Sequence, residues 1–273
     1  MTTIGGALAA VGGRIDAREA RVLLAHVLEK DATYLAAYPD APLGPAQKRA
    51  FDSALSRRAQ GEPVAYITGR REFHSLEFQV TPAVLIPRPE TELLVDLALE
   101  RIAMGEARRV LDLGTGSGCV AISIAYERPH ARVLAVDVSL QALSVARQNA
   151  NRLGVSGVEF IAGDWFEPIG AQLFDVIVAN PPYVAEGDAH LAQGDLRYEP
   201  RDALVAGRDG LAAIRRIVVD GARCLHRGGT LLLEHGYEQG PACRALLRAS
   251  GLQAVETWRD LAGLERVSGG RSA

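Results

Sequence analysis

The fold depends first on Val110-Leu111-Asp112-Leu113-Gly114-Thr115-Gly116-Ser117-Gly118, an apolar run that leads into a glycine-rich turn. Val110–Leu113 predicts a buried strand, and Cys119–Glu127 predicts the helix that follows. Glycines at such a junction let the backbone turn tightly and approach a ligand at the helix N-terminus. The stretch therefore predicts a ligand-binding loop, and the alternative is a tight turn without a ligand.

Strand and helix patterns alternate after this loop. The further predicted strands are Arg132–Val136, Val158–Ala162, Phe174–Ala179 and Thr230–Glu234, and the helices between them are Leu140–Leu153 and Leu211–Leu225. Continuous apolar strands separated by helices are typical of a parallel sheet that is covered on both faces. We expect a Rossmann-like α/β sheet that is mostly parallel, with one antiparallel strand around Val255–Arg259 or Arg266 and a frayed tail from Ser268.

The first 70 residues have a different pattern. Asp16 can cap a helix over Ala17–Lys30, and a second helix is predicted over Ala46–Gln60. Prolines then interrupt Glu62–Glu92, within which Glu72–Val80 alternates weakly, as a short hairpin does. We expect a small N-terminal helical domain (1–70), a hairpin-containing linker (71–92) and an α/β domain (93–273).

Composition narrows the class of protein. The chain has 273 residues, 48% of them hydrophobic and 23% charged, with a net charge of −3, which fits a folded protein of one or two domains without a basic excess for nucleic acid. No long apolar run and no signal-peptide pattern is visible, so we expect a cytoplasmic protein that does not enter a membrane. The cysteines are three and widely spaced, and the six histidines lack metal-ligand spacing, so we expect no metal site.

The spacing of the glycines points to one ligand class. A dinucleotide fingerprint requires Gly-x-Gly-x-x-Gly, but Cys119 stands where its third glycine would be. The loop is instead Gly-x-Gly-x-Gly headed by Asp112, which resembles the first motif of class I S-adenosylmethionine-dependent methyltransferases. The candidate cofactor-binding residues of this loop are Gly114, Thr115, Gly116, Ser117 and Gly118.

Two later strand ends add to this candidate site. Asp137 follows the second strand, where a carboxylate can accept both ribose hydroxyls; its alternative role is to cap the next helix. Gly163-Asp164-Trp165-Phe166 follows the third strand, and the resemblance implies that this loop flanks the adenine. Trp165 can cover the adenine face, or it can be a packing residue at the rim of the sheet.

Asn180-Pro181-Pro182-Tyr183 is the most specific short segment, and it follows the fourth strand. The prolines stiffen the loop, and the segment is a hallmark of methyltransferases that modify a nitrogen in a planar, conjugated group. The Asn180 side-chain oxygen and the Pro181 carbonyl can accept hydrogen bonds from a substrate NH₂, which favours positive charge on that nitrogen. Tyr183 can stack on the flat face of the substrate. We expect Asn180 and Tyr183 to be the catalytic residues and Asn180–Tyr183 to bind the substrate.

Other segments make the resemblance more specific. Over nearly its whole length the chain resembles the HemK-type release-factor glutamine methyltransferases, a resemblance carried by the following segments: Gly61–Pro63, Tyr66–Gly69, Ile86–Glu92, Leu111–Gly118, Asp164–Phe166, Asn180–Tyr183, Arg197–Pro200, Ala203-Leu204, Glu234–Gly236 and Glu265–Val267. Several of these lie outside the generic methyltransferase motifs. Many members have Asp where Glu90 stands here.

The resemblance implies a class I methyltransferase domain that methylates the glutamine amide nitrogen in the Gly-Gly-Gln motif of class 1 peptide-chain release factors. S-adenosylmethionine is then the methyl donor, and N5-methylglutamine and S-adenosylhomocysteine are the products. It also implies that the helical domain contacts the release factor, and that Gly114–Gly118, Asp137, Trp165 and Asn180 line the cofactor site. We expect a monomer that binds no nucleic acid directly. Arg88, Glu90 and Glu199 are left between a functional role and a structural ion pair.

Two alternatives remain. A DNA adenine or RNA guanine N-methyltransferase shares both loops but needs a basic groove, for which Arg57, Arg58, Arg70 and Arg71 are the nearest candidates. A non-catalytic nucleotide-binding module has no need of the Asn180–Tyr183 clamp.

Overall fold

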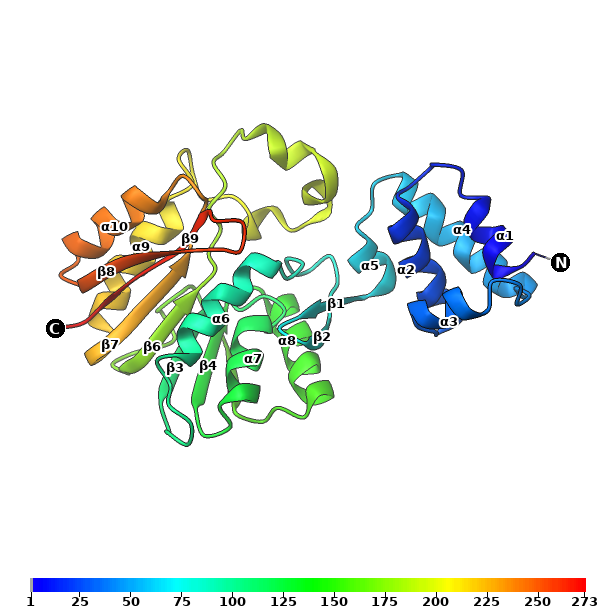
Figure 1. Cartoon of the computed structure of the whole chain (residues 1–273). Coiled ribbons are helices and arrows are strands. Elements are labelled where there is room, and N and C mark those ends of the chain that lie inside the picture. Colours follow the sequence, from blue (N-terminus) through cyan, green and yellow to red (C-terminus); the bar gives the residue numbers. More distant parts are fainter. Residues whose placement is uncertain (1) are drawn as a thin grey trace. The chain divides into compact units, whose positions relative to one another are not determined.

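The computed structural model describes residues 2–273, and the chain forms two compact units (Figure 1). One unit contains the N-terminal residues up to Arg70 together with Ala192–Tyr198, and the other contains Arg71–Leu191 and Glu199–Ala273. The hairpin predicted for the linker therefore falls in the second unit, apart from its first residue. No helix of the described chain combines the length and the apolar character that a membrane span requires.

Short helices build the first unit. They are α1 (Ile4–Ala9), α2 (Ala17–Leu28), α3 (Ala32–Ala37), α4 (Pro45–Ala59) and α5 (Val64–Thr68). The side chain of Asp16 caps α2 by accepting from the backbone N–H groups of Arg18 and Glu19, as the sequence predicts. Apolar side chains that recur at helical spacing, among them Leu23 and Leu24 of α2 and Phe51 of α4, form one buried cluster.

The segment Ala192–Tyr198 packs on this unit although it lies far along the chain. Arg58 donates to Asp195 at 2.9 Å and to Glu19 at 2.8 Å, and the Tyr198 hydroxyl donates to the carbonyl of Gln60 at 2.9 Å. The Arg197 guanidinium lies where a Cβ of residue 61 would stand, and Gly61 has φ +98°, so glycine is required at this turn. The helical unit therefore depends on residues from the second half of the sequence.

The second unit contains two sheets and the helices that cover the larger one. Strands β1 (Arg70–Phe73) and β2 (Leu76–Gln79) form a hairpin. The remaining strands are β3 (Arg109–Leu113), β4 (Arg132–Asp137), β5 (Val158–Ala162), β6 (Phe174–Ala179), β7 (Leu225–Glu234), β8 (Gln253–Arg259) and β9 (Glu265–Arg271). The helices are α6 (Glu92–Leu99), α7 (Cys119–Glu127), α8 (Leu140–Leu153), α9 (Ala212–Arg223) and α10 (Gly240–Ala249), with short 3₁₀ turns η1 (Pro89–Thr91) and η4 (Arg201–Ala203). Two further 3₁₀ turns, η2 (Ala189–Ala192) and η3 (Gly194–Tyr198), lie where the chain enters the first unit and within that unit.

The large sheet has the order β5-β4-β3-β6-β7-β9-β8 and is parallel except at β9, which pairs antiparallel with β7 and β8. The prediction of a mostly parallel sheet with one antiparallel strand is confirmed. The predicted frayed tail is wrong, because Ser268 is fully buried in β9 and is in register with Leu233. Two consecutive glycines, Gly269 and Gly270, make this strand difficult to predict from the sequence, because glycine is depleted in strands.

Helices cover both faces of this sheet, and successive side chains along a strand point to opposite faces. Val176 and Val178 of β6 pack in the cluster that contains α6 and α7, whereas Ile177 and Ala179 pack in the cluster that contains α9 and α10. This double burial explains why β6 is apolar at every position from 176 to 179. The largest difference from the predicted boundaries is at β7: α9 ends at Arg223, and the strand predicted to start at Thr230 already begins at Leu225.

The strand order reverses beside β3, and the candidate site lies at that point. The chain runs from β3 to β4 and β5 on one side and then returns to place β6 on the other side of β3. Leu113 is in register with Ala179, so the loops after β3 and β6 leave the sheet side by side. In open α/β sheets such a switch point opens a crevice at the carboxyl ends of the strands.

We predict that deletion of residues 268–273 prevents the second unit from folding. The deletion removes half of β9, whose buried residues lie between β7 and β8, and it exposes the core beneath them. Circular dichroism should show loss of the cooperative thermal transition, while deletion of Ala273 alone should leave the transition unchanged. A cooperative transition at the full-length midpoint in the 268–273 deletion would contradict this placement of β9.

Candidate active site

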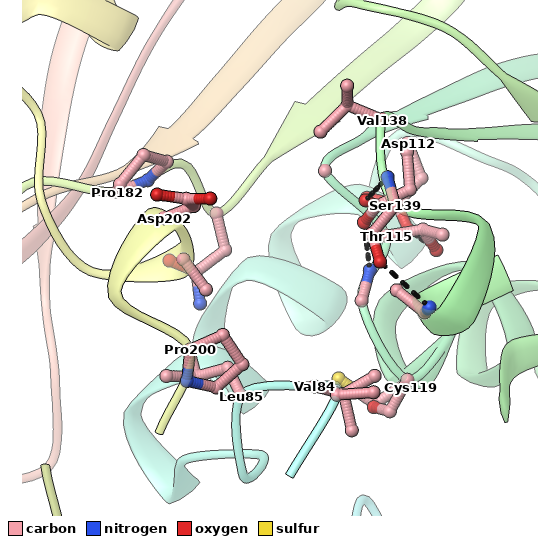
Figure 2. Close-up of a pocket in the computed structure, with 18 of the residues that line it drawn as sticks. Val84, Leu85, Asp112, Thr115, Cys119, Val138, Ser139, Pro182, Pro200 and Asp202 are labelled. Atoms are coloured by element: carbon pink, nitrogen blue, oxygen red, sulfur yellow. Dashed lines mark hydrogen bonds between the residues drawn. The ribbon is translucent and has the colours of Figure 1, made fainter. Parts of the chain in front are cut away.

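A cavity of about 500 Å³ lies at the carboxyl ends of β3, β4 and β6, all within the second unit. Figure 2 shows Asp112, Thr115, Val138 and Ser139 on one side of it and Pro182 and Asp202 on the other. Cavities of this volume suit ligands the size of a nucleoside derivative. The segment before α6 also contributes to the lining, through residues that include Val84, Leu85, Arg88 and Thr91.

The glycine-rich loop forms one wall of the cavity. Gly114, Gly116 and Gly118 have φ angles of +73°, +56° and +82°, a region that other residues rarely adopt. The backbone N–H of Gly116 donates to Asp137 at 2.8 Å, and the Thr115 hydroxyl donates to Asp112 at 2.6 Å. Gly114, Thr115, Gly116 and Ser117 line the cavity, whereas Gly118 caps the N-terminus of α7. The side chains of Asp112 and Asp137 therefore hold the conformation of this loop.

Asp137 ends β4 and lines the cavity. Besides Gly116 it accepts from the backbone N–H of Ser139 at 2.8 Å, and the residue that caps α8 is Ser139 rather than Asp137. Burial raises the pKa of Asp137, and the hydrogen bonds from Ser139 and Gly116 oppose that rise. The exposed side chain of Val138 follows at the rim of the cavity and offers an apolar surface beside the carboxylate.

Trp165 lines the cavity as well, and it packs against the sheet. Its ring lies 3.3 Å from the position that a Cβ of Gly114 would take, so the glycine makes room for the indole. The backbone of Trp165 has φ +53°, an unusual conformation for a bulky side chain. The neighbouring Asp164 accepts from Arg216 at 2.6 Å, an ion pair that the sequence did not reveal.

The loop after β6 forms the opposite wall. Asn180 and Pro182 line the cavity, whereas Pro181 and Tyr183 do not. The side-chain Nδ2 of Asn180 donates to the Thr91 hydroxyl at 3.1 Å, which leaves Oδ1 of Asn180 as an acceptor. The Tyr183 hydroxyl donates to Glu234 at 3.1 Å, and Gln239 holds the Tyr183 carbonyl at 3.0 Å. Of the four predicted residues, Asn180 and Pro182 therefore line the cavity, and Pro181 and Tyr183 are their neighbours in the same loop.

Burial shifts the titration of two carboxyl groups at the site, Asp112 and Glu234. Burial raises the pKa of Asp112 and the pKa of Glu234 each to about 7, and hydrogen bonds from Thr115 in the first case and from Thr91 and Tyr183 in the second act in the opposite direction. Among the described residues, no group of three or more metal-ligating side chains is placed to hold an ion.

Arg88 and Glu199 form an ion pair, which answers part of a question that the sequence left open. The side chain of Glu199 is fully buried, and it also accepts from the backbone N–H of Ile86 at 3.1 Å. Pro200 and Asp202, which follow Glu199, line the cavity, as do Pro87 and Arg88. The pair therefore joins two segments of the cavity wall.

Four residues of the site are not marked by any sequence motif of their own: Thr91, Val138, Asp202 and Glu234. Thr91 and Glu234 do lie within segments that carry the family resemblance, and that was the available signal. Their roles depend on side chains that meet across η1, β6 and β7, which no local pattern reports. Val138 is adjacent to Asp137 and could have been named from that position.

Comparison with known proteins agrees with this fold. A family model described as "Methyltransferase small domain" matches residues 90–196, and one described as "PrmC N-terminal domain" matches residues 4–69. The chain also resembles a solved Thermus thermophilus 16S rRNA N2 G1207 methyltransferase in complex with AdoMet and guanosine, with a TM-score of 0.55, 22% identity, and coverage of 75% of this chain and 50% of that one. Fold and site together define a class I methyltransferase.

Its relatives define the family within that class. The release factor glutamine methyltransferase of Bordetella pertussis is 52% identical, over 92% of this chain and 93% of that protein. The protein of the same name from Escherichia coli K12 is 45% identical, over 93% of this chain and 91% of its own length. The chain belongs to the release factor glutamine methyltransferases.

We predict that buried Asp112 makes the stability of the ligand-free protein depend on pH. Its pKa is about 7 when folded against an ordinary 3.8, so between these values the folded protein keeps a proton that the unfolded chain releases. The free energy of unfolding therefore falls as the pH rises through this window. Asp112→Asn cannot titrate, and its loss of stability from pH 4 to pH 8 should be smaller by a few kcal/mol, at about 1.4 kcal/mol per pKa unit.

Urea unfolding at several pH values measures this difference. Glu234 titrates in the same window, so the Asp112→Asn variant should retain part of the pH dependence. Asp40→Asn, which changes an exposed carboxyl of the helical unit, is the control. Parallel curves for Asp112→Asn and the wild type would contradict the assignment.

Proposed function

We propose that this chain methylates the side-chain amide nitrogen of the glutamine in the Gly-Gly-Gln motif of class 1 peptide-chain release factors. S-adenosylmethionine is the methyl donor, and N5-methylglutamine and S-adenosylhomocysteine are the products. The observation that carries the proposal is the orientation of Asn180. Its Nδ2 is engaged by Thr91, so its Oδ1 is left to accept from a substrate NH₂ at the cavity next to the glycine-rich loop.

The donor set of the cavity fits this cofactor. Asp137 offers carboxylate oxygens for ribose hydroxyls, Val138 and Trp165 offer apolar surface for adenine, and Gly114–Gly118 allows close backbone approach. Buried Asp112 suits a cationic partner such as the amino group of the methionine part, because a nearby cation stabilises its charged form. When bound, S-adenosylmethionine supplies a methyl group on a positively charged sulfur.

The residues of the loop after β6 then act on the substrate. Asn180 Oδ1 and the Pro181 carbonyl accept from the two N–H groups of the glutamine amide, which aims the nitrogen and favours the positive charge that it gains. Tyr183, held by Glu234 and Gln239, supports the flat carboxamide. Alignment of nitrogen and methyl group removes a large part of the barrier.

We further propose that the helical unit contacts the release factor and that the protein acts as a cytoplasmic monomer without direct nucleic-acid binding. Two basic residues that could have lined a nucleic-acid groove have partners within the chain: Arg57 pairs with Glu62, and Arg58 pairs with Glu19 and Asp195. Paired arginines contribute less to a phosphate-binding surface, which supports a protein substrate over DNA or RNA.

We expect Asp137→Ala to weaken cofactor binding with little effect on the fold. The change removes the acceptor for ribose and also frees Gly116, so the glycine-rich loop loses one of its anchors. Isothermal titration calorimetry with S-adenosylhomocysteine should show an affinity at least about tenfold lower, the equivalent of 1.4 kcal/mol. Asp188→Ala, an exposed carboxyl outside the cavity, should bind as the wild type does. Equal affinities for Asp137→Ala and the wild type would exclude Asp137 from the cofactor site.

Transfer of a labelled methyl group to purified release factor tests the activity. The wild type should label the factor and should not label a version in which the Gly-Gly-Gln glutamine is replaced. Asn180→Ala should lower kcat by about 10²–10³, the typical cost of one preorganised hydrogen bond, whereas Asn151→Ala on the exposed surface of α8 should not. Equal labelling of both factors would overturn the substrate, and label on an oligonucleotide with strong salt dependence would favour a nucleic-acid substrate.

A further inference from the structure

Glu234 is a buried carboxyl group that the steps described above use only as a support for Tyr183. It ends β7, is 1% exposed and accepts from the Tyr183 hydroxyl through Oε1 at 3.1 Å. Its other oxygen, Oε2, is buried without a partner in hydrogen-bond geometry. A buried carboxyl that is only partly satisfied costs stability, and an apolar residue would end this strand at no such cost. Its position therefore calls for a functional explanation.

Thr91 connects this carboxyl to Asn180. Thr91 is 1% exposed, its Oγ1 accepts from Asn180 Nδ2 at 3.1 Å, and its side chain favours the ionised form of Glu234, whose pKa it lowers. A hydroxyl has one proton to donate and two lone pairs to accept with. An ionised Glu234 attracts the hydroxyl proton of Thr91 toward itself, which directs the lone pairs of Thr91 to the amide NH₂ of Asn180.

Tyr183 forms a second arm that ends on the same carboxyl. Burial, followed by the charge of Glu234, raises the pKa of Tyr183, so its hydroxyl stays protonated and donates to Glu234. The two residues expected to grip the substrate, Asn180 and Tyr183, are thus oriented from a single buried group. These residues are far apart in the sequence: Thr91 belongs to η1, Asn180 and Tyr183 follow β6, and Glu234 ends β7.

We propose that Glu234 is a positioning residue that fixes the Asn180 amide through Thr91 and the Tyr183 ring directly, so that Asn180 Oδ1 faces the substrate nitrogen. The proposal rests on the proposed function. The direction of the hydrogen bonds is the essential point. An Asn180 side chain turned by 180° would present its NH₂ to the NH₂ of the glutamine, and two donors repel each other.

Protonation of Glu234 weakens this arrangement, because a neutral carboxyl can donate to Thr91 and compete with Asn180 for its lone pairs. Burial raises the pKa of Glu234 to about 7. The charge of Arg266 in β9 lowers the pKa of Glu234, and the charge of Glu90 in η1 raises it. The other titratable groups near Glu234 are Cys119 of α7 and Tyr183. The ionised form is the ordered one, so kcat should rise as the pH increases through about 7.

Glu234→Gln tests the direction of the hydrogen bonds at nearly constant volume. The glutamine NH₂ is a donor where the site needs acceptors, so kcat should fall about 10- to 100-fold, and the rise of kcat near pH 7 should disappear. KM for S-adenosylmethionine should stay within about twofold, because Glu234 does not line the cavity.

Thr91→Val and Thr91→Ser separate the hydroxyl from the packing of the side chain. The valine variant should lose about as much kcat as Glu234→Gln, and the serine variant, which keeps the hydroxyl, should recover most of it. The double variant Thr91→Val with Glu234→Gln should be little worse than either single one, because both act on Asn180 through one chain of hydrogen bonds. Thr230→Val, another buried threonine on β7, is the matched control and should keep wild-type kcat.

A readout without substrate keeps this inference separable from the proposed function. The ¹⁵N–¹H signals of the Asn180 side-chain NH₂, assigned by their loss in Asn180→Ala, should be protected from solvent exchange in the wild type and exposed in Thr91→Val and Glu234→Gln. If the wild type fails to methylate the release factor, the proposed function fails, and this spectrum still tests the orientation of Asn180.

Either of two results overturns the proposal. One is an unchanged kcat and pH profile in folded Glu234→Gln, and the other is an unchanged Asn180 signal in Thr91→Val. Should Glu234→Gln not fold, as judged by thermal unfolding, the comparison of Thr91→Val with Thr91→Ser decides: equal kcat in these two variants would contradict the proposal.

Discussion

The parallel pairing of β3 with β6 is the constraint on which the rest of the site depends. Residues 110–113 are in register with residues 176–179, so both strands end at one level and both loops leave the sheet there. Backbone hydrogen bonds set this alignment, and the side chains of both strands are buried on both faces, which holds the register fixed. The glycine-rich loop and Asn180 are therefore neighbours because of sheet pairing, although 62 residues separate Gly118 from Asn180 in the sequence.

Buried charge is the second feature that organises the site. Asp112 and Glu234 are each buried in surroundings that disfavour ionisation, and hydroxyl groups act on both carboxyls in the opposite direction. Such groups stabilise a fold poorly, and they are retained where a direction or a charge must be maintained. In this protein Asp112 lines the cavity next to the glycine-rich loop, and Glu234 lies outside the lining, where it contacts Tyr183 of the loop after β6.

Much of this architecture could be predicted from the sequence, for identifiable reasons. The helices over Cys119–Glu127 and Leu140–Leu153 and the strands over Val158–Ala162 and Phe174–Ala179 have the predicted bounds, because apolar periodicity and flanking glycines mark them clearly. The C-terminal antiparallel strand was predicted near Arg266, but its continuation through Ser268–Arg271 was not, because Gly269 and Gly270 are poor strand formers; close contact with Leu231 and Leu232 explains why Gly269 is needed there. Local propensity is a weak guide where tertiary packing selects the residue.

Some residues of the candidate site could be predicted from the sequence, and others could not. Residues that act through the backbone or through a fixed motif, such as Gly116 and Asn180, were visible in the sequence. Thr91 and Glu234 were quoted only within longer segments, because their significance lies in one hydroxyl that joins two distant elements. Arg88 and Glu199 could be considered as an ion pair from the sequence, but only the structure shows that they are partners.

The interleaving of the two units limits how this protein can be recombined with its relatives. A helical part exchanged at Arg70 would arrive without Ala192–Tyr198, and Arg58 would then face a foreign residue in place of Asp195. Chimeras that transfer both stretches together should behave better than those joined at a single crossover. Substitutions of Arg58 or Gly61 should accordingly be tolerated only together with compensating substitutions in Ala192–Tyr198. Arg58 and its partner Asp195 are 137 residues apart in the sequence.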